Sequence, residues 1–244
     1  EIGVRLVGSE MCIRDRPSDT PEKDMSTLHS LYGYGFVGVV LISTLFLQFV
    51  GKEYWMYLTF FWAILPVIAS ILLMTSPLPN MNMEHSEATV TKSKHRTKSL
   101  LLCMACIFLG ACAENTMSNW ISVYTENALH MPKIWGDILG MCLFAVLLAL
   151  TRTAYAKYGK NISKVLTLSM LGAAVCYLIV AFSPNAVLSL IACIAVGICS
   201  SMLWPGTLIL MEEKVPAVGV AAYALMAAGG DLGASVAPQT LGII

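Results

Sequence analysis

Five residues of one apolar stretch could act together chemically: Glu114, Asn115, Asn119, Trp120 and Tyr124. On a helix, residues four apart share a face, which places Asn115 with Asn119 and Trp120 with Tyr124. Carboxylate and amide groups pair with hydroxyls, and an aromatic ring packs against the apolar face of a sugar. The set therefore predicts a site for a small polar solute or a proton. The alternative is hydrogen bonding between helices that serves the fold alone.

Asp231 is the sixth candidate, and it lies near the middle of the last apolar stretch, within Ala-Gly-Gly-Asp-Leu-Gly. Charged groups inside a bilayer are costly and persist mainly where they have a function. Asp231 could carry a proton, or the neighbouring glycines could allow close packing around a structural carboxylate. We predict no metal site and no cofactor. Cys103 and Cys106 form a CxxC pair, but within an apolar run and without further ligands they are best interpreted as packing residues.

The elements that must position these residues are membrane-spanning helices. The sequence is 57% hydrophobic and only 12% charged, with a mean hydropathy of +0.72, whereas soluble proteins carry about 25% charged residues. Its net charge of zero and lack of a basic stripe argue against a nucleic-acid partner. A bilayer takes roughly 20 apolar residues per helix, which predicts an all-α, polytopic membrane helix bundle with seven spans. The predicted spans are 28–50, 54–75, 99–125, 134–155, 164–182, 186–210 and 217–244.

Positive charge predicts how the spans are oriented. Ten lysines and arginines, Arg152 among them, fall on one side of the predicted spans, and only Lys52 and Lys133 fall on the other. Because cytoplasmic loops carry the excess of Lys and Arg, segments 76–98 and 156–163 are expected in the cytoplasm. Residues 1–16 match nothing that follows and are expected to be non-native. Residues 17–75 then form the end of an N-terminal half, 76–98 a cytoplasmic linker, and 99–244 five helices of a C-terminal half.

Glycines inside the spans have a packing interpretation. Gly33, Gly35 and Gly38 spell GxGxxG, but a dinucleotide site would need a strand before them. Inside a membrane span they are expected to let another helix approach closely, as are the pairs Gly136/Gly140 and Gly229/Gly233 at GxxxG spacing.

The two-half layout and several motifs resemble the major facilitator superfamily. The turn after Arg152 partly matches that family's loop pattern G-x-x-x-D-R-x-G-R-[RK] through Arg152, Gly159 and Lys160, with a Thr in place of the Asp. Three segments, 28–35, 110–124 and 203–207, are similar to the fucose-permease-like branch of sugar:proton symporters. The resemblance implies helices 5–11 of a twelve-helix transporter, here a fragment that lacks the remaining helices.

The predicted function follows from that resemblance and from the polar residues within the spans. We expect a secondary transporter, not an enzyme, in the cytoplasmic membrane. It would move a small polar solute, a sugar, by alternating access coupled to protons, and would be a monomer when full length. Glu114, Asn115, Asn119, Trp120, Tyr124 and Asp231 would bind the solute or proton. The alternatives are a drug or metabolite exporter of the same family, with a larger and more apolar cavity, and a membrane sensor or structural protein.

Overall fold

The computed structural model describes residues 21–75, 94–215 and 220–243, and all of its regular elements are helical. The elements are α2 (Pro21–Phe49), η1 (Lys52–Tyr54), α3 (Trp55–Thr75), α4 (Lys94–Asn127), α5 (Lys133–Trp135), the π-helical η3 (Gly136–Cys142), α6 (Leu143–Tyr158), α7 (Ile162–Phe182), α8 (Ala186–Ser200), α9 (Pro205–Lys214) and α10 (Val220–Ile243). The expected non-native segment 1–16 and most of the expected linker 76–98 lie outside the described residues.

The predicted all-α membrane helix bundle is confirmed, and six of the seven predicted spans are found among the described residues. In the described ranges, six helices are long and apolar enough to cross a membrane, with α5, η3 and α6 forming one and α8 with α9 forming another. The seventh predicted span is α10, which has 24 residues but is not among the six.

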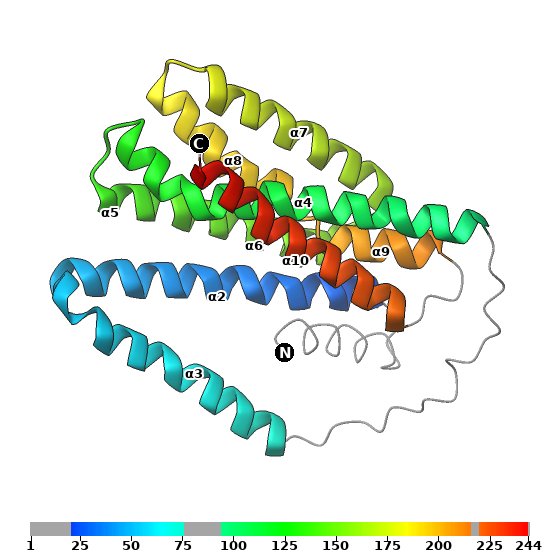
Figure 1. Cartoon of the computed structure of the whole chain (residues 1–244), viewed down its shortest axis with the longest axis horizontal. Helices are drawn as coiled ribbons and strands as arrows, with labels where there is room; N and C mark the ends of the chain where they lie inside the picture. Colours follow the sequence, from blue (N-terminus) through cyan, green and yellow to red (C-terminus); the bar gives the residue numbers. More distant parts are fainter. Residues whose placement is uncertain (1–20, 76–93, 216–219, 244) are drawn as a thin grey trace.

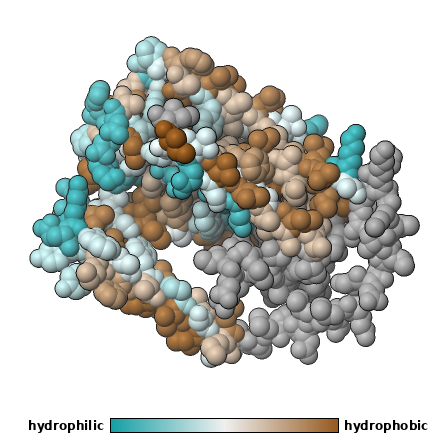
Figure 2. Space-filling model, in the orientation of Figure 1, coloured by the Kyte–Doolittle hydropathy of each residue, from teal (hydrophilic) through white to brown (hydrophobic). Residues whose placement is uncertain are grey.

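Figure 1 shows how the helices are arranged. Helix α10 lies across α4, α2 lies beside α6, and α7 packs against α8. Helix α3 leaves the bundle after the turn at Gly51, and only Leu58 in it is buried. Brown apolar side chains cover much of the face in Figure 2, including α3. An apolar outer surface of this extent is what a helix bundle presents to lipid.

Glycine positions account for the closest helix contacts. A Cβ at Gly33 would lie 2.7 Å from Cβ of Ala149, so α2 touches α6 there. Gly136 and Gly140 face α4 in the same way, and Gly229 and Gly233 also face α4, from α10. The predicted packing role is confirmed for these five glycines. It is wrong for Gly35 and Gly38, where an added Cβ would meet no atom within 4 Å.

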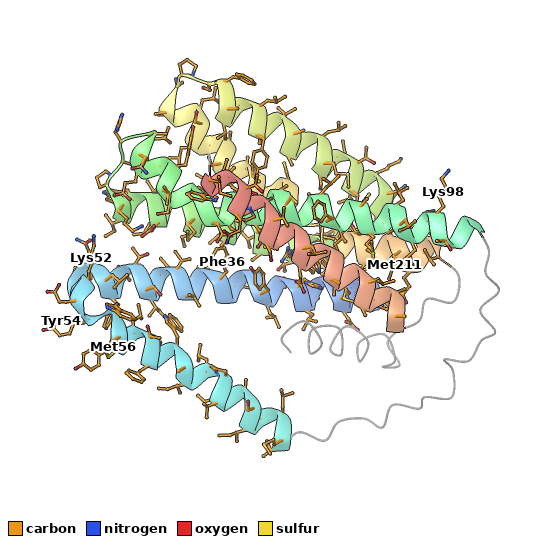
Figure 3. The ribbon with its side chains drawn as sticks, in the orientation of Figure 1. Phe36, Lys52, Tyr54, Met56, Lys98 and Met211 are labelled. Atoms are coloured by element: carbon orange, nitrogen blue, oxygen red, sulfur yellow. The ribbon has the colours of Figure 1, made fainter. Side chains whose placement is uncertain are left out.

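A polar contact ties α2 to the C-terminal helices at the opposite end from Lys98. Asp137 of η3 accepts hydrogen bonds from Ser122 of α4 and, at 3.2 Å, from Thr44 of α2. Lys133 forms an ion pair with the same carboxylate at 3.6 Å. Figure 3 shows Lys52 and Lys98 at opposite ends of the helices, as expected for residues on opposite sides of a membrane.

Candidate functional site

A buried ion pair lies at the centre of the candidate site. Nη2 of Arg152 on α6 donates to both carboxylate oxygens of Glu114 on α4, at 3.1 Å to Oε1 and 2.9 Å to Oε2. The Arg152 side chain is 2% exposed and the Glu114 side chain 11% exposed. Charges this deeply buried are tolerated when they are paired and when their remaining hydrogen-bonding groups are also satisfied.

The other donors of Arg152 reach two further parts of the fold. Nε donates to the carbonyl of Ser201 at 2.7 Å, and Nη1 donates to the carbonyl of His29 on α2 at 3.1 Å. The backbone of Arg152 is also engaged, since Ser26 Oγ donates to its carbonyl at 2.8 Å. The ring of Tyr32 lies 5.9 Å from the guanidinium carbon, within the range of a cation–π contact. Arg152 therefore connects α2, α4 and α6 to the break between α8 and α9.

Pro205 explains why a carbonyl is available at Ser201. Helix α8 ends at Ser200 and α9 begins at Pro205. Proline has no N–H and cannot donate to the carbonyl four residues earlier, which is that of Ser201. Arg152 Nε supplies the missing donor. The chain between α8 and α9 is therefore a break in the helix, and Trp204 lies within it.

A cavity of about 220 Å³ opens beside the ion pair. Its lining residues come from α2, α4, α6, α10 and the α8–α9 break: His29, Tyr32, Glu114, Asn115, Arg152, Trp204, Asp231 and Ala234. The Trp204 ring lies against Gly230, where a Cβ would overlap it. Asp231 is exposed, and no described residue hydrogen-bonds to its carboxylate or pairs with it. The cavity therefore offers one neutralised carboxylate, one free carboxylate, an amide and two aromatic rings.

Counting Arg152 among the cytoplasmic charges was wrong, because Arg152 does not lie in the turn that follows α6. It lies in α6, six residues before the helix ends at Tyr158, and its side chain is buried. It therefore cannot serve as the arginine of the loop pattern, and nine charges rather than ten remain on the predicted cytoplasmic side. The sequence analysis also gave Glu114 no charged partner, whereas Arg152 neutralises it.

The predicted binding residues separate into three groups. Glu114, Asn115 and Asp231 line the 220 Å³ cavity. Asn119 and Trp120 line a second cavity further along α4. Tyr124 lines neither of the two cavities: its hydroxyl donates to the carbonyl of Val180 at 3.2 Å, and its ring packs against a buried cluster that includes Phe144 and Cys193.

Sequence reasoning missed Ala234 and four lining residues with polar or aromatic side chains: His29, Tyr32, Arg152 and Trp204. His29, at the start of the first predicted span, is buried. The available signal was Arg152 itself, a permanent charge inside Leu-Ala-Leu-Thr-Arg-Thr-Ala-Tyr, only four residues from Leu148. A cation in such a run is a candidate for pairing with an acid in another span.

Metal and disulfide chemistry have no support in the described ranges. No group of three or more His, Cys, Asp or Glu side chains there could hold a metal ion. Cys103, Cys106 and the five other cysteines that the structure describes are free thiols.

The fold and the cavity define a class: a polytopic membrane helix bundle with a polar cavity formed between its spans, as in solute transporters. Comparison with protein families agrees. The family model described as Major Facilitator Superfamily matches residues 20–238, and the chain belongs to this family. Its members are secondary transporters of small molecules, not enzymes, and the chain is a multi-pass membrane protein. Comparisons with curated proteins and with solved structures found no match.

Proposed function

We propose that this protein transports a small, neutral, polyhydroxylated solute, such as a sugar, through the 220 Å³ cavity. The observation that carries the proposal is the set of groups that meet there: the Glu114–Arg152 pair, Asn115, the free Asp231 and the ring of Trp204. Amide and carboxylate oxygens accept hydrogen bonds from hydroxyls, and the indole ring provides an apolar platform.

The size of the cavity favours a small solute over a drug. Cavities that hold drug-sized ligands measure roughly 300–1,000 Å³, and this one measures about 220 Å³.

The charges favour a solute that donates hydrogen bonds over an anion. Arg152 directs its guanidinium at Glu114 and at the carbonyls of Ser201 and His29. An anionic solute would have to compete with Glu114 for that cation while facing the Asp231 carboxylate. Sugar hydroxyls meet acceptors on both carboxylates without this repulsion.

Proton coupling is assigned to Asp231 in this proposal. The cost of an unpaired carboxylate in a membrane suggested a proton-carrying role for Glu114, but Arg152 removes that cost from Glu114. Asp231 has no such partner among the described residues. A proton on Asp231 would neutralise this unpaired charge. The cavity could then switch from opening on one side of the membrane to opening on the other.

The two helix sets fit a two-half transporter. Helices α2 and α3 precede segment 76–93, and α4–α10 follow it. In transporters built from repeats, the site lies between the halves, which rock against each other. We assign α2 and α3 to the N-terminal half and α4–α10 to the C-terminal half. The protein would then be a monomeric, fucose-permease-like symporter of the cytoplasmic membrane, with 156–163 on the cytoplasmic side.

Uptake into proteoliposomes tests the substrate class. The purified full-length transporter is supplied in turn with radiolabelled D-glucose, D-galactose, L-fucose and D-xylose, and separately with tetraphenylphosphonium. We expect saturable uptake of at least one sugar, increased by an inward proton gradient, and none of the lipophilic cation. Saturable transport of tetraphenylphosphonium and of none of the sugars would contradict the proposal and favour the exporter.

A further inference from the structure

A second cavity, of about 450 Å³, lies between α4 and α10. It is lined by Asn119, Trp120, Val123, Pro238, Gln239, Gly242 and Ile243. None of these residues lines the 220 Å³ cavity beside the ion pair, so the two spaces are distinct.

The two cavities lie in series along one pair of helices. Gly229 faces Met104, Gly233 faces Phe108 and Gly242 faces Trp120, so α10 and α4 advance in the same direction, as Figure 1 also shows. Asn115 lines the first cavity and Asn119 the second. These residues are one helical turn apart, roughly 6 Å along the axis.

The two asparagines form a continuous polar edge between the cavities. Nδ2 of Asn119 donates to the carbonyl of Asn115 at 2.7 Å, and Nδ2 of Asn115 donates to the carbonyl of Ala111 at 3.0 Å. Both amide oxygens therefore remain as acceptors. A solute that leaves one cavity meets the same type of group in the next.

Trp120 is held as a fixed platform in the second cavity. Its Nε1 donates to the carbonyl of Pro238 at 3.0 Å, and its ring lies on Gly242, where a Cβ would approach Cζ2 to 2.7 Å. Gln239 is exposed at the same cavity, and its amide has no partner among the described residues. An oriented ring with amides beside it is the chemistry that recognises a polyhydroxylated solute.

We propose that the second cavity is a staging site, which binds the same neutral polyhydroxylated solute before it enters, or after it leaves, the cavity beside Glu114 and Arg152. This inference rests on the proposed function for the nature of the solute. Asn119 and Gln239 would bind its hydroxyls, and Trp120 would pack against its apolar face.

Tryptophan fluorescence can report on the two cavities separately, because Trp204 lines one and Trp120 the other. Two variants of the full-length transporter are made in which Trp120 or Trp204 is the single tryptophan and all others are replaced by Phe. They are studied in lipid nanodiscs free of sugar-headed detergent. D-Glucose, D-galactose, L-fucose and D-xylose are the probes.

We expect one of these sugars to change the emission of both reporters saturably. In the Trp120 reporter, Gln239→Leu should raise the half-saturating concentration about tenfold, since one or two hydrogen bonds are lost. The matched control is Gln48→Leu, an exposed glutamine on α2 that does not line the second cavity. It should leave the half-saturating concentration unchanged.

The remaining outcomes separate the two proposals. A response of Trp204 alone, or a Trp120 response that Gln239→Leu leaves unchanged, would overturn the staging site and keep the proposed function. A Trp120 response without one from Trp204 would support the staging site and contradict solute binding in the first cavity. No response from either reporter to any of the four sugars would overturn both.

Discussion

Removing one member of the Glu114–Arg152 pair should be far more damaging than removing both. Arg152→Met would leave the Glu114 carboxylate buried without a partner and would take donors from the carbonyls of Ser201 and His29. Breaking a buried pair in this way costs about 3–5 kcal/mol. Glu114→Leu should cost a similar amount, because it leaves the guanidinium, 2% exposed, without its counter-charge.

The double variant Glu114→Leu/Arg152→Met contains neither charge. It still loses the two hydrogen bonds to backbone carbonyls, which we expect to cost about 1–3 kcal/mol. The two single losses added together come to at least about 6 kcal/mol, so the coupling energy should be at least about 3 kcal/mol, at the top of the range measured for contacting residues. Arg152→Lys should lower the free energy of unfolding by less than Arg152→Met does. It keeps a positive charge, but an ammonium cannot reproduce the four hydrogen bonds that the planar guanidinium makes.

The free energy of unfolding is measured for the full-length transporter and the four variants by SDS titration in mixed micelles. Single-variant losses below about 1 kcal/mol, or effects that add within about 0.5 kcal/mol, would show that the pair does not hold these helices together. Arg152 and Glu114 would then not be the contact that joins α2, α4 and α6 to the α8–α9 break.

Three further outcomes are expected. Gly33→Ala should destabilise the protein by about 1–3 kcal/mol in the same titration, because the added Cβ would press against α6. Gly38→Ala is the control: it has open space around it and should stay within about 0.5 kcal/mol of wild type. Equal losses in the two variants would refute the close approach of α2 and α6 at Gly33. Asp231→Asn should abolish accumulation driven by a proton gradient but leave counterflow exchange, which moves no net proton, and accumulation at the wild-type level would exclude Asp231 as the carrier. On a cysteine-free background in intact cells, an impermeant maleimide should label Ala128→Cys and miss Lys160→Cys, and the reverse order would invert the orientation.

The helices were predictable because the signal for a span is local. A bilayer-length run of apolar residues is visible in the sequence, and the observed ends at Phe49 and Phe182 fall within one residue of the predicted ones. The α8–α9 interruption was harder to predict. Pro205 permits a kink by itself, and it becomes a break here through Arg152, a residue in another helix that satisfies the freed carbonyl.

The site was only partly predictable because its pairings are long-range. Glu114 and Arg152 are 38 residues apart, and proximity to a turn made Arg152 look like a topological charge. Asn115 and Asn119 do share a helix face, as periodicity predicts. They line different cavities because the neighbour changes along α4: Asp231 approaches beside Asn115, while Gln239 and the carbonyl of Pro238 approach beside Asn119 and Trp120.

Solute protection of a cysteine in the first cavity tests the central claim most directly. Ala234 lines that cavity, and Ser163, near the start of α7, lies outside it. Ala234→Cys and, as a control, Ser163→Cys are placed in a cysteine-free full-length transporter, and the rate of modification by a small water-soluble methanethiosulfonate is measured with and without the best-transported sugar. We predict that saturating sugar slows modification at position 234 by about tenfold, as occlusion of most binding sites requires, and leaves the rate at 163 unchanged. Equal rates at position 234 with and without sugar would contradict the claim that the solute binds beside Glu114 and Arg152.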